Sequence, residues 1–384
     1  MNILYSTSSS FLDSDLPLLK AYSEAGHSVY LIVSIQPNGL KSTVVSISEQ
    51  YSEEGLFDYR DIYPNEFKIF AEYTGVKRLL ILNSLTNSLT FKTVKYHYQI
   101  RKFIRDNQID VHHYIGLPSI MAVPALICAP CKRVVTVHDP VPHDDEALLK
   151  LRIMYFAVLK FFRNVILLNT VQTEEFKKYY FVRNTKIYYS RLGNYETLRL
   201  FGEKKFSSLR TILFYGRITP YKGVDVLLKA FKKIEKQNTD VKLIVAGKGH
   251  FSFDISSYIN DPQIEINNDY ISLENLCSLI KSCEFSVCPY ISATQSGVVA
   301  SVLALGKPLI VTNVGGLPTM IEEGKSGFVV ESNNPDALAN AMNMMLNDKN
   351  LLDSMYKYIS ESSLDGKNSW NKIAQNNLRI YNSL

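Results

Sequence analysis

The chain has 384 residues, more than one hydrophobic core usually organises, so we expect two domains. Apolar residues make up 46% and charged residues 21%, a balance that excludes an intrinsically disordered chain. The formal net charge is +5, and the whole surplus of Lys and Arg lies in residues 1–205, so the sequence predicts a basic surface on the first half only.

Apolar strand patterns and helical patterns alternate along the whole chain. The predicted strands are Asn2–Tyr5, Ser28–Val33, Val111–Tyr114, Arg133–Val137, Val165–Asn169, Arg210–Tyr215, Lys242–Ala246, Phe285–Cys288 and Leu309–Val311. The predicted helices include Leu16–Ala25, Thr93–Asn107, Val224–Gln237, Leu273–Lys281 and Gly297–Leu305. This alternation predicts parallel sheets with helices on both faces. Right-handed crossovers then place ligand-binding loops at the carboxyl ends of the strands.

A polar stretch, Glu196–Ser208, separates the two halves of this pattern. The predicted fold class is therefore α/β, with two Rossmann-like, doubly wound parallel-sheet domains facing across a cleft. We predict domains at residues 1–205 and 206–364, followed by a terminal helix over 365–384. This helix has Trp370, Ile373, Leu378 and Tyr381 at helical spacing, so its apolar side should pack on a domain, with a return to the first domain left open.

Neither a leader nor a membrane span is predicted. Met1–Tyr5 begins directly as a buried strand, without the basic start and apolar run of a signal peptide. The most apolar stretch, Ile153–Phe162, is interrupted by Lys160 and is shorter than the about 20 residues that span a bilayer. Five cysteines, an odd number, argue against a disulfide framework, and the Cys128 and Cys131 pair lacks the second pair of a zinc site. We expect a cytoplasmic protein.

The clearest chemical signal is the segment GRITPYKGVDVLLKAF at residues 216–231. A buried strand ends at Tyr215, Gly216 turns the chain, and the cations follow in the loop before the next helix. Arg217 and Lys222 can both reach one diphosphate there, since Arg offers a planar fork and Lys a mobile charge. A solvated loop with two ordinary charges is the alternative, and the segments described next weigh against it.

The second chemical signal is PYISATQSGVVASVLALGKPLIVTNVGGLP at residues 289–318. A strand ends at its start, a loop of small residues follows over Ser292–Gly297, and an apolar helix begins there. The first N–H groups of a helix are free and lie at the positive end of its dipole, which favours phosphate. Thr294, Gln295 and Ser296 can add side-chain hydrogen bonds.

Together these segments resemble the donor-binding domain of family 4 glycosyltransferases, which have the GT-B fold and act with retention of anomeric configuration. The blocks that carry the resemblance, in the family's order and spacing, are GRITPYKG, Ala246–Gly249, ATQSG, ALGKPLIVTNVGGLP and EEGKSGFVV. The first half resembles the family less specifically, through AGHSVYLIV at 25–33 and TVHDPVPH at 136–143. The resemblance implies that residues 1–205 bind the acceptor and that residues 206–364 bind a nucleotide-sugar donor.

The resemblance also implies roles for particular residues. Arg217 and Lys222 would hold the donor diphosphate, and Tyr270 with Ile271 would flank the base. The backbone of residues 295–298 would contact the phosphates. The candidate donor-binding residues are Ser9, Ser10, Gly216, Arg217, Lys222, Gly247, Tyr270, Ile271, Thr294, Gln295, Ser296, Gly297, Val298 and Ser301. The candidate catalytic residues are His138, Arg217 and Lys222.

Two features of the family are absent from this sequence. The family carries a Glu, seven residues and a second Glu across the phosphate loop, where this chain has Ala293 and Ser301. The first Glu normally lies near the transferred sugar and the second near the ribose, so the sugar contacts here must differ. The usual Gly-Gly after the first strand is replaced by Ser8–Ser9–Ser10, whose Cβ atoms restrict the approach of a phosphate.

His138 follows the predicted strand that ends at Val137. The resemblance implies a functional histidine here that faces the donor sugar across the cleft, while a structural loop histidine is the equal alternative. Asp139 can orient its ring or cap the next turn. We interpret the acidic run 144–146 as an exposed loop, and no metal or other cofactor is expected, because Arg217 and Lys222 can stabilise the diphosphate.

Three acid-free segments of the first half combine basic and aromatic residues: Lys92–Arg105, Lys150–Arg163 and Lys177–Arg191. Solvated helix faces are the ordinary interpretation of such segments. Because they lie in the half that should bind the acceptor, we predict contact with anionic lipid headgroups. Nucleic acid is not an expected partner, since the aromatics follow no RNA-binding motif and the second half has no excess charge.

The sequence therefore predicts transfer of a sugar from a UDP- or GDP-sugar to a glycan or lipid-linked acceptor, in bacterial-type surface polysaccharide or glycoconjugate synthesis. The protein should be cytoplasmic and peripheral on the inner face of the membrane. A catalytically silent relative that binds sugar or a partner enzyme is one alternative, and a nucleotide-sugar epimerase of similar fold is another. The base, the sugar, the acceptor, the linkage and the oligomeric state stay open.

Overall fold

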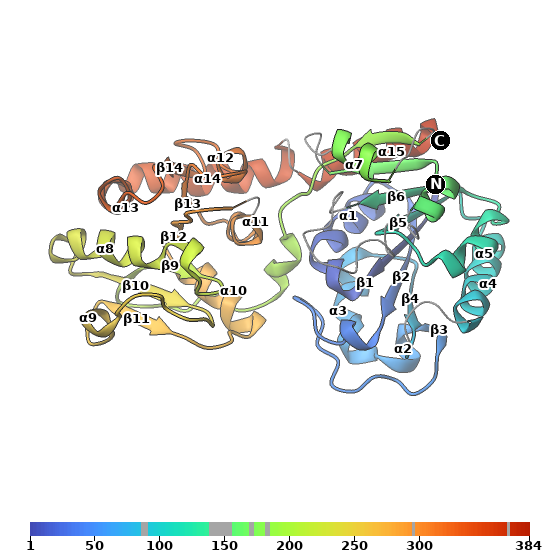
Figure 1. The fold of residues 1–384 in the computed structure, drawn as a ribbon, viewed down its shortest axis with the longest axis horizontal. Coiled ribbons are helices and arrows are strands. Elements are labelled where there is room, and N and C mark those ends of the chain that lie inside the picture. Colours follow the sequence, from blue (N-terminus) through green and yellow to red (C-terminus); the bar gives the residue numbers. More distant parts are fainter. Residues whose placement is uncertain (86–90, 138–155, 169–172, 181–184, 294–295, 367–368) are drawn as a thin grey trace. The chain divides into compact units, whose positions relative to one another are not determined.

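The computed structural model describes the chain apart from residues 86–90, 138–155, 169–172, 181–184, 294–295 and 367–368 (Figure 1). The chain divides into two compact units. The first comprises Met1–Gly193 together with Trp370–Leu384, and the second comprises Asn194–Ser369. Among the described residues, none of the helices combines the length and the apolar character that crossing a bilayer requires.

An eight-stranded sheet in the order β3-β4-β2-β1-β5-β6-β7-β8 organises the described part of the first unit. Its strands are β1 (Asn2–Ser8), β2 (Ser28–Ile35), β3 (Gly55–Asp58), β4 (Arg78–Asn83), β5 (Val111–Ile115), β6 (Lys132–Val137), β7 (Asn164–Leu167) and β8 (Lys186–Tyr189). Neighbouring strands pair in parallel, except that the edge strand β3 runs antiparallel to β4. The strand order reverses at β1, which lies between β2 and β5, so the loops at the carboxyl ends of these strands bound a crevice.

Helices lie on both faces of this sheet (Figure 1). They include α1 (Leu12–Glu24), α2 (Tyr59–Ile62), α3 (Pro64–Thr74), α4 (Phe91–Asp106), α5 (Val123–Ile127), α7 (Thr173–Tyr180) and α15 (Trp370–Ser383). Helix α1 packs against α3 and α15, while α4 packs against α5. Short 3-10 turns follow several strands, including η1 (Ser9–Phe11) directly after β1.

The second unit is built on a six-stranded, all-parallel sheet in the order β11-β10-β9-β12-β13-β14. Its strands are β9 (Arg210–Tyr215), β10 (Val241–Ala246), β11 (Ile264–Asn267), β12 (Phe285–Cys288), β13 (Leu309–Thr312) and β14 (Gly327–Val330). Its helices are α8 (Val224–Ile234), α9 (Ser256–Ile259), α10 (Leu273–Ser282), α11 (Gly297–Ala304), α12 (Leu317–Met320), α13 (Pro335–Asn347) and α14 (Lys349–Asp365), with the 3-10 turns η4 (Glu196–Leu200), η5 (Pro220–Lys222) and η6 (Glu235–Gln237).

The predicted α/β class is confirmed, and the central strands of the second unit lie where the apolar runs predicted them. Strands β9 and β12 read as continuous apolar runs because both of their faces are buried. The prediction missed β3, β4, β8, β11 and β14, together with α3, α13 and α14. Most of these strands lie at or next to a sheet edge, and several are short and only partly buried, so their sequence pattern is weak.

The terminal helix belongs to the first unit. The two units divide after Gly193, whereas the sequence suggested a boundary after residue 205, and α15 begins at Trp370 and not at 365. The Tyr381 hydroxyl lies 2.9 Å from the Tyr22 hydroxyl of α1 and 2.5 Å from Nδ1 of the buried His113 on β5. The helix thus completes the polar interior of the first unit.

Candidate active site

The loop between β9 and α8 carries the two cations that the sequence singled out. Gly223 ends this loop with φ of +65°, and a Cβ there would lie 1.9 Å from the Pro289 carbonyl oxygen. Only glycine allows the loop to lie this close to the chain that leaves β12. The close packing brings Arg217, which is exposed, and Lys222, which is half-buried, to the carboxyl edge of the sheet.

The environment of Lys222 is cationic and aromatic. Its Nζ lies 3.7 Å from the centre of the Tyr290 ring, a cation–π contact. Burial lowers the pKa of Lys222, and the nearby Arg217 guanidinium lowers it further, while the Cys288 thiol acts in the opposite direction. Within the described residues neither cation forms an ion pair. Two neighbouring cations without an acidic partner form a site suited to an anion.

The helix α11 begins across the same edge of the sheet. Its first residue is Gly297, and its N-cap residue, Ser296, makes no side-chain cap to the helix. The Ser296 hydroxyl instead lies 3.3 Å from the Tyr290 hydroxyl, and the Tyr215 hydroxyl donates to the Val298 carbonyl. The N-cap side chain therefore leaves the first N–H groups of α11 unbonded, an arrangement that favours phosphate. Thr294 and Gln295, which were predicted to contribute, lie outside the described residues.

A third loop, which follows β10, packs against the loop that follows β9. Gly247 has φ of +143°, and a Cβ there would lie 2.0 Å from the Gly216 carbonyl oxygen. The Asn268 side chain accepts from the Gly249 N–H and donates to the Gly249 carbonyl, which ties this loop to the end of β11. The ends of β9, β10, β11 and β12 thus form one continuous edge.

Tyr270 and Ile271 lie at this edge, in the loop after β11. Both line a hollow of about 620 Å³ that extends over β10, β11 and α10. The Tyr270 side chain is 81% exposed, so its ring is free to contact a ligand. This is the place that the resemblance assigned to the base.

Ala293 and Ser301 occupy the positions of the two missing glutamates, and their surroundings differ. Ala293 packs as a partly buried residue against the hydrophobic core. Ser301 is buried, and its hydroxyl donates to the Gly297 carbonyl at 2.7 Å within its own helix. Its hydroxyl is therefore engaged inside the helix.

The predicted site residues of the first unit are Ser9, Ser10 and His138. Ser9 is buried, and its hydroxyl donates to the Gly39 carbonyl at 2.6 Å, so it ties β1 to the loop after β2. Ser10 is exposed beside it. His138 directly follows β6 but lies outside the described residues, as do the acidic residues 144–146.

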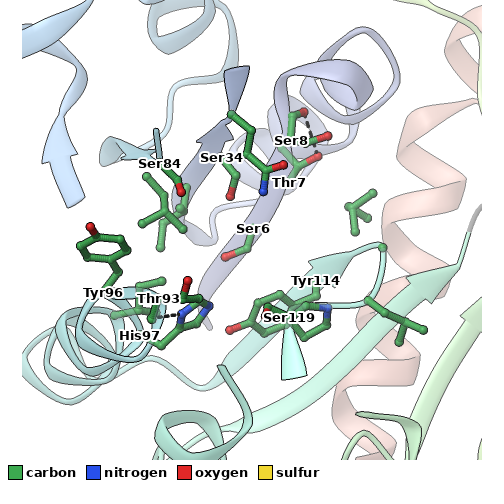
Figure 2. A pocket seen from close by; sticks show the side chains of 18 residues that line it. Ser6, Thr7, Ser8, Ser34, Ser84, Thr93, Tyr96, His97, Tyr114 and Ser119 are labelled. Atoms are coloured by element: carbon green, nitrogen blue, oxygen red, sulfur yellow. Dashed lines mark hydrogen bonds between the residues drawn. The ribbon is translucent and has the colours of Figure 1, made fainter. Parts of the chain in front are cut away.

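The sequence did not predict a cavity of about 210 Å³ in the first unit, shown in Figure 2. It lies at the carboxyl ends of β1, β2, β4 and β5, beside α4. Hydroxyl side chains from all these elements line it: Ser6, Thr7, Ser8, Ser34, Ser84, Thr93, Tyr96, Tyr114 and Ser119. The sequence signal that could have found it is the recurrence of Ser or Thr at the ends of successive strands.

Metal ligands are not grouped in the part of the chain that the structure describes. There, no three His, Cys, Asp or Glu side chains come close enough together to hold a metal ion. The acidic run 144–146 lies outside this search.

The second unit matches a known protein family. Residues 199–362 match the family described as "Glycosyl transferases group 1". An uncharacterised glycosyltransferase of Methanocaldococcus jannaschii is 31% identical over 175 residues, which cover 45% of this chain and 48% of that protein. The spore coat protein SA of Bacillus subtilis is 26% identical over 186 residues, with 45% and 48% covered. The chain spans about half the length of these curated relatives.

Solved structures resemble the chain over its whole length. A glycosyltransferase from Rickettsia africae has a TM-score of 0.62 at 18% identity, covering 100% of this chain and 98% of that one. Anabaena HepE, solved in complex with UDP, has a TM-score of 0.61 at 14% identity and covers 100% of both chains. The two parallel sheets and these likenesses define the fold as GT-B, the fold of two Rossmann-like domains. Within the second unit, the likeness to group 1 glycosyl transferases extends over residues 199–362.

Proposed function

We propose that the protein is a family 4 glycosyltransferase that transfers a sugar from a nucleoside-diphosphate sugar to a glycan or lipid-linked acceptor. One observation carries the proposal: Arg217 and Lys222, which form no ion pair among the described residues, lie in one loop at the edge of the sheet where α11 begins without a cap from Ser296. Such an edge binds the diphosphate and stabilises the charge that develops on it as the sugar leaves. Surface polysaccharide or glycoconjugate synthesis is the proposed setting.

The donor is proposed to be a UDP- or GDP-sugar. HepE was solved with UDP and with UDP-glucose, which supports a uridine nucleotide. The base would lie against Tyr270 in the hollow at the end of β11, and the phosphates would lie between Lys222 and the start of α11. On the acceptor side, His138 stays the proposed catalytic residue of the first unit.

Retention of configuration and independence from metal belong to the same proposal. The two cations provide the charge that a divalent ion provides in other transferases. Turnover should therefore persist in EDTA. Loss of turnover in EDTA, with recovery on adding Mg²⁺ or Mn²⁺, would assign the acidic run 144–146 to a metal site.

A lipid-linked acceptor requires contact with a membrane surface, which we propose for the basic first unit. Lys95 and Lys102 are exposed on α4, whereas Lys92 is paired with Glu54 at 2.6 Å. A second basic area surrounds a hollow of about 400 Å³ lined by Lys132, Arg133, Lys160 and Arg163, with Phe161 47% exposed beside them. Cations around an exposed aromatic ring suit an anionic, partly apolar surface. This contact would hold a cytoplasmic protein at the inner face of the membrane.

Binding of nucleotides tests the donor site directly. At least one of UDP and GDP should raise the melting temperature of the protein, because a ligand that binds only the folded state stabilises it by mass action. The rise should disappear in Arg217→Ala and persist in Lys236→Ala, an exposed lysine of the turn that follows α8. A melting temperature that neither nucleotide changes would contradict the donor assignment.

Product analysis separates the alternatives. A silent relative would bind the nucleotide sugar without releasing nucleoside diphosphate, and the absence of both glutamates at positions 293 and 301 is the observation that favours it. An epimerase would change the sugar in the absence of any acceptor, and a putative UDP-N-acetylglucosamine 2-epimerase from Listeria monocytogenes shares the fold, with a TM-score of 0.58 at 12% identity. Nucleoside diphosphate released only with an acceptor or water supports transfer.

A further inference from the structure

The Lys222 ammonium group differs from those of the other part-buried lysines among the described residues of the second unit. Of these, Lys232 and Lys242 pair with carboxylates, and Lys281 and Lys307 donate to backbone carbonyls. Lys222 Nζ has no oxygen acceptor within the described residues, although its side chain is half-buried. Burying an ammonium group without a hydrogen-bond acceptor costs free energy, so another contact must stabilise it.

The ring of Tyr290 takes the place of an oxygen acceptor. Lys222 Nζ lies 3.7 Å from the centre of this ring and 5.2 Å from the centre of the Tyr221 ring. The face of an aromatic ring is negative and attracts an ammonium group, but it does not occupy all of the N–H groups as a set of oxygens would. The N–H groups of Lys222 that point away from the ring therefore stay available for the oxygens of a ligand.

Tyr290 is held in place by its own contacts. Its side chain is 1% exposed, and its carbonyl accepts hydrogen bonds from the Thr312 hydroxyl at 2.6 Å and from the Ser332 hydroxyl at 3.0 Å. The ring is thus a fixed surface for the flexible stem of Lys222. A lysine loses rotamer entropy when it is ordered, and the ring contact makes part of that loss occur before a ligand binds.

The Tyr290 hydroxyl reaches the other part of the candidate donor site. It lies 3.3 Å from the hydroxyl of Ser296, the N-cap residue of α11, which makes no cap to its own helix. The N–H of Ile291, the next residue, donates to the Tyr221 carbonyl at 2.8 Å, in the loop that carries Lys222. Tyr290 therefore contacts both parts of this edge that are expected to bind phosphate, the lysine and the helix start.

We propose that Tyr290 is a positioning residue of the donor site, and this rests on the proposed function. Its ring holds the Lys222 ammonium group beside the start of α11, and its hydroxyl holds Ser296 there. Tyr290 is too buried to touch a ligand, so it acts through these two residues. It is not among the residues that the sequence predicted for this site. Because the diphosphate gains charge as the sugar leaves, loss of this positioning should lower kcat more than it raises KM.

The test changes the charge distribution of the ring and keeps its shape. Tyr290→Phe is the reference, since it removes only the hydroxyl, and it is compared with trifluorophenylalanine introduced at position 290. Fluorine withdraws electrons from the ring and weakens its attraction for a cation, whereas the packing stays nearly the same. Isothermal calorimetry would measure binding of UDP or GDP, whichever binds the natural chain, and initial rates would give kcat and KM.

The fluorinated ring should weaken nucleotide binding and lower kcat about tenfold relative to Tyr290→Phe, the effect of one desolvated cation–π contact. Tyr290→Phe itself should lose about threefold relative to the natural chain, because it keeps the ring and loses only the long contact to Ser296. In a Lys222→Ala background, exchanging Phe for the fluorinated ring should leave the residual turnover unchanged, as expected for two residues that act together. A residue with a merely structural role would not distinguish rings of the same shape.

The charge of Lys222 gives a second measurement, made without nucleotide. In protein that contains isotope-labelled lysine, the NMR signal of Lys222 is the one absent from Lys222→Arg. Its pKa should be lower with the fluorinated ring than in Tyr290→Phe, because the charged form loses the attraction of the ring. The other titratable groups that face it, Arg217, Cys288 and Tyr221, are the same in both proteins.

The control is the same fluorinated ring in place of Tyr358 of α14, which lies 5.5 Å from Lys325 Nζ in the same unit. It should change neither nucleotide binding nor the pKa of Lys222. Two results would overturn the role of Tyr290 alone: nucleotide binding and Lys222 pKa that are equal in the two ring variants, or an equal loss of turnover in the Lys222→Ala background. A natural chain that bound neither UDP nor GDP would instead reject the donor proposal, and the role of Tyr290 with it.

Discussion

At the scale of single residues, Arg217 and Lys222 carry the proposed chemistry. Replacing either by Ala should lower turnover of a nucleotide sugar by about 10²-fold or more, as the loss of an electrostatic stabiliser typically does. Initial rates of nucleoside diphosphate release would measure the effect. Lys236→Ala, which removes an exposed charge from the turn after α8, should leave the rate unchanged. Unchanged rates in both site variants would remove the diphosphate assignment.

The buried carboxyl group of Asp15 should make the free energy of unfolding depend on pH. It is fully buried in α1, and this burial raises its pKa to about 7, against hydrogen bonds from Thr7 at 2.6 Å and Tyr5 at 2.9 Å. Between about pH 4 and about pH 7 the folded chain keeps a proton that the unfolded chain releases. The contribution of Asp15 to stability is therefore lost as pH rises, by up to about 1.4 kcal/mol per unit.

Asp15→Asn stays uncharged at every pH, so it isolates this effect. The free energy of unfolding of the variant relative to the natural chain should increase from pH 5 to pH 8. Urea unfolding of both chains at each pH would measure it, and the groups common to both chains cancel in the difference. A difference that is the same at both pH values would show that Asp15 ionises normally.

Single residues also show that the local sequence does not determine which hydrogen bond a side chain forms. Ser301 was recognised as the substitute for a glutamate, but its hydrogen bond to the Gly297 carbonyl follows only from the helical backbone. Ser9 stays a predicted donor-binding residue, and its hydroxyl donates to the Gly39 carbonyl, thirty residues away. A residue type predicts which hydrogen bonds are possible, whereas the packing decides which one forms.

At the scale of elements, α15 stabilises the first unit although it is far away in sequence. Trp370 is 6% exposed, and a Cβ added at Gly193 would lie 2.5 Å from its ring. Trp370→Ala should destabilise the first unit by about 3–5 kcal/mol, the cost of removing a buried aromatic side chain. Thermal unfolding would measure the change, with the exposed Asn371→Ala as control. Equal melting temperatures would mean that α15 docks without stabilising the unit.

The periodicity of α15 was predicted, but not its exact buried face. Trp370, Ile373 and Tyr381 are buried as predicted, whereas Leu378 is only partly buried and Asn377 takes the inner position. Asn377 is polar, so an apolar pattern could not assign it. The buried Tyr22 and Tyr381 hydroxyls explain why a polar residue is accepted there.

At the scale of the whole molecule, the asymmetric charge predicts salt-dependent binding of the first unit to anionic vesicles. Each Lys or Arg near the surface contributes about 1 kcal/mol, and screening acts over about 8 Å at physiological ionic strength. Charge reversal at Lys95, Arg101 and Lys160 should reduce sedimentation with vesicles and leave UDP binding intact; Arg152, of the same segment as Lys160, lies outside the described residues.

The control reverses charges in the second unit, at the exposed Lys236 and Lys349. These changes should leave sedimentation unaltered, which separates a specific surface from net charge alone. Equal sedimentation with neutral and anionic vesicles, independent of salt, would contradict the membrane proposal and favour a soluble acceptor.

The sequence by itself determined the α/β class and the loop between β9 and α8, at the carboxyl edge of the second unit's sheet. Arg217, Lys222 and Gly223 lie within one loop, so their spacing along the chain already expresses their spacing in the fold. Parallel strands such as β9 and β12 can be predicted because both of their faces are buried and their residues are mostly apolar. Local geometry and local composition coincide there, and so the strands and the loop between them could be predicted.

Only the tertiary structure decided the cavity of the first unit and the place of the terminal helix. The cavity joins Ser6, His97 and Tyr114 from β1, α4 and β5, and these residues become neighbours only when the three elements are packed. Helix α15 joins α1 across more than 340 intervening residues, as the 359-residue separation of Tyr22 and Tyr381 shows. Long-range contacts of this kind depend on the packing of whole elements, which the pattern within any one segment does not contain.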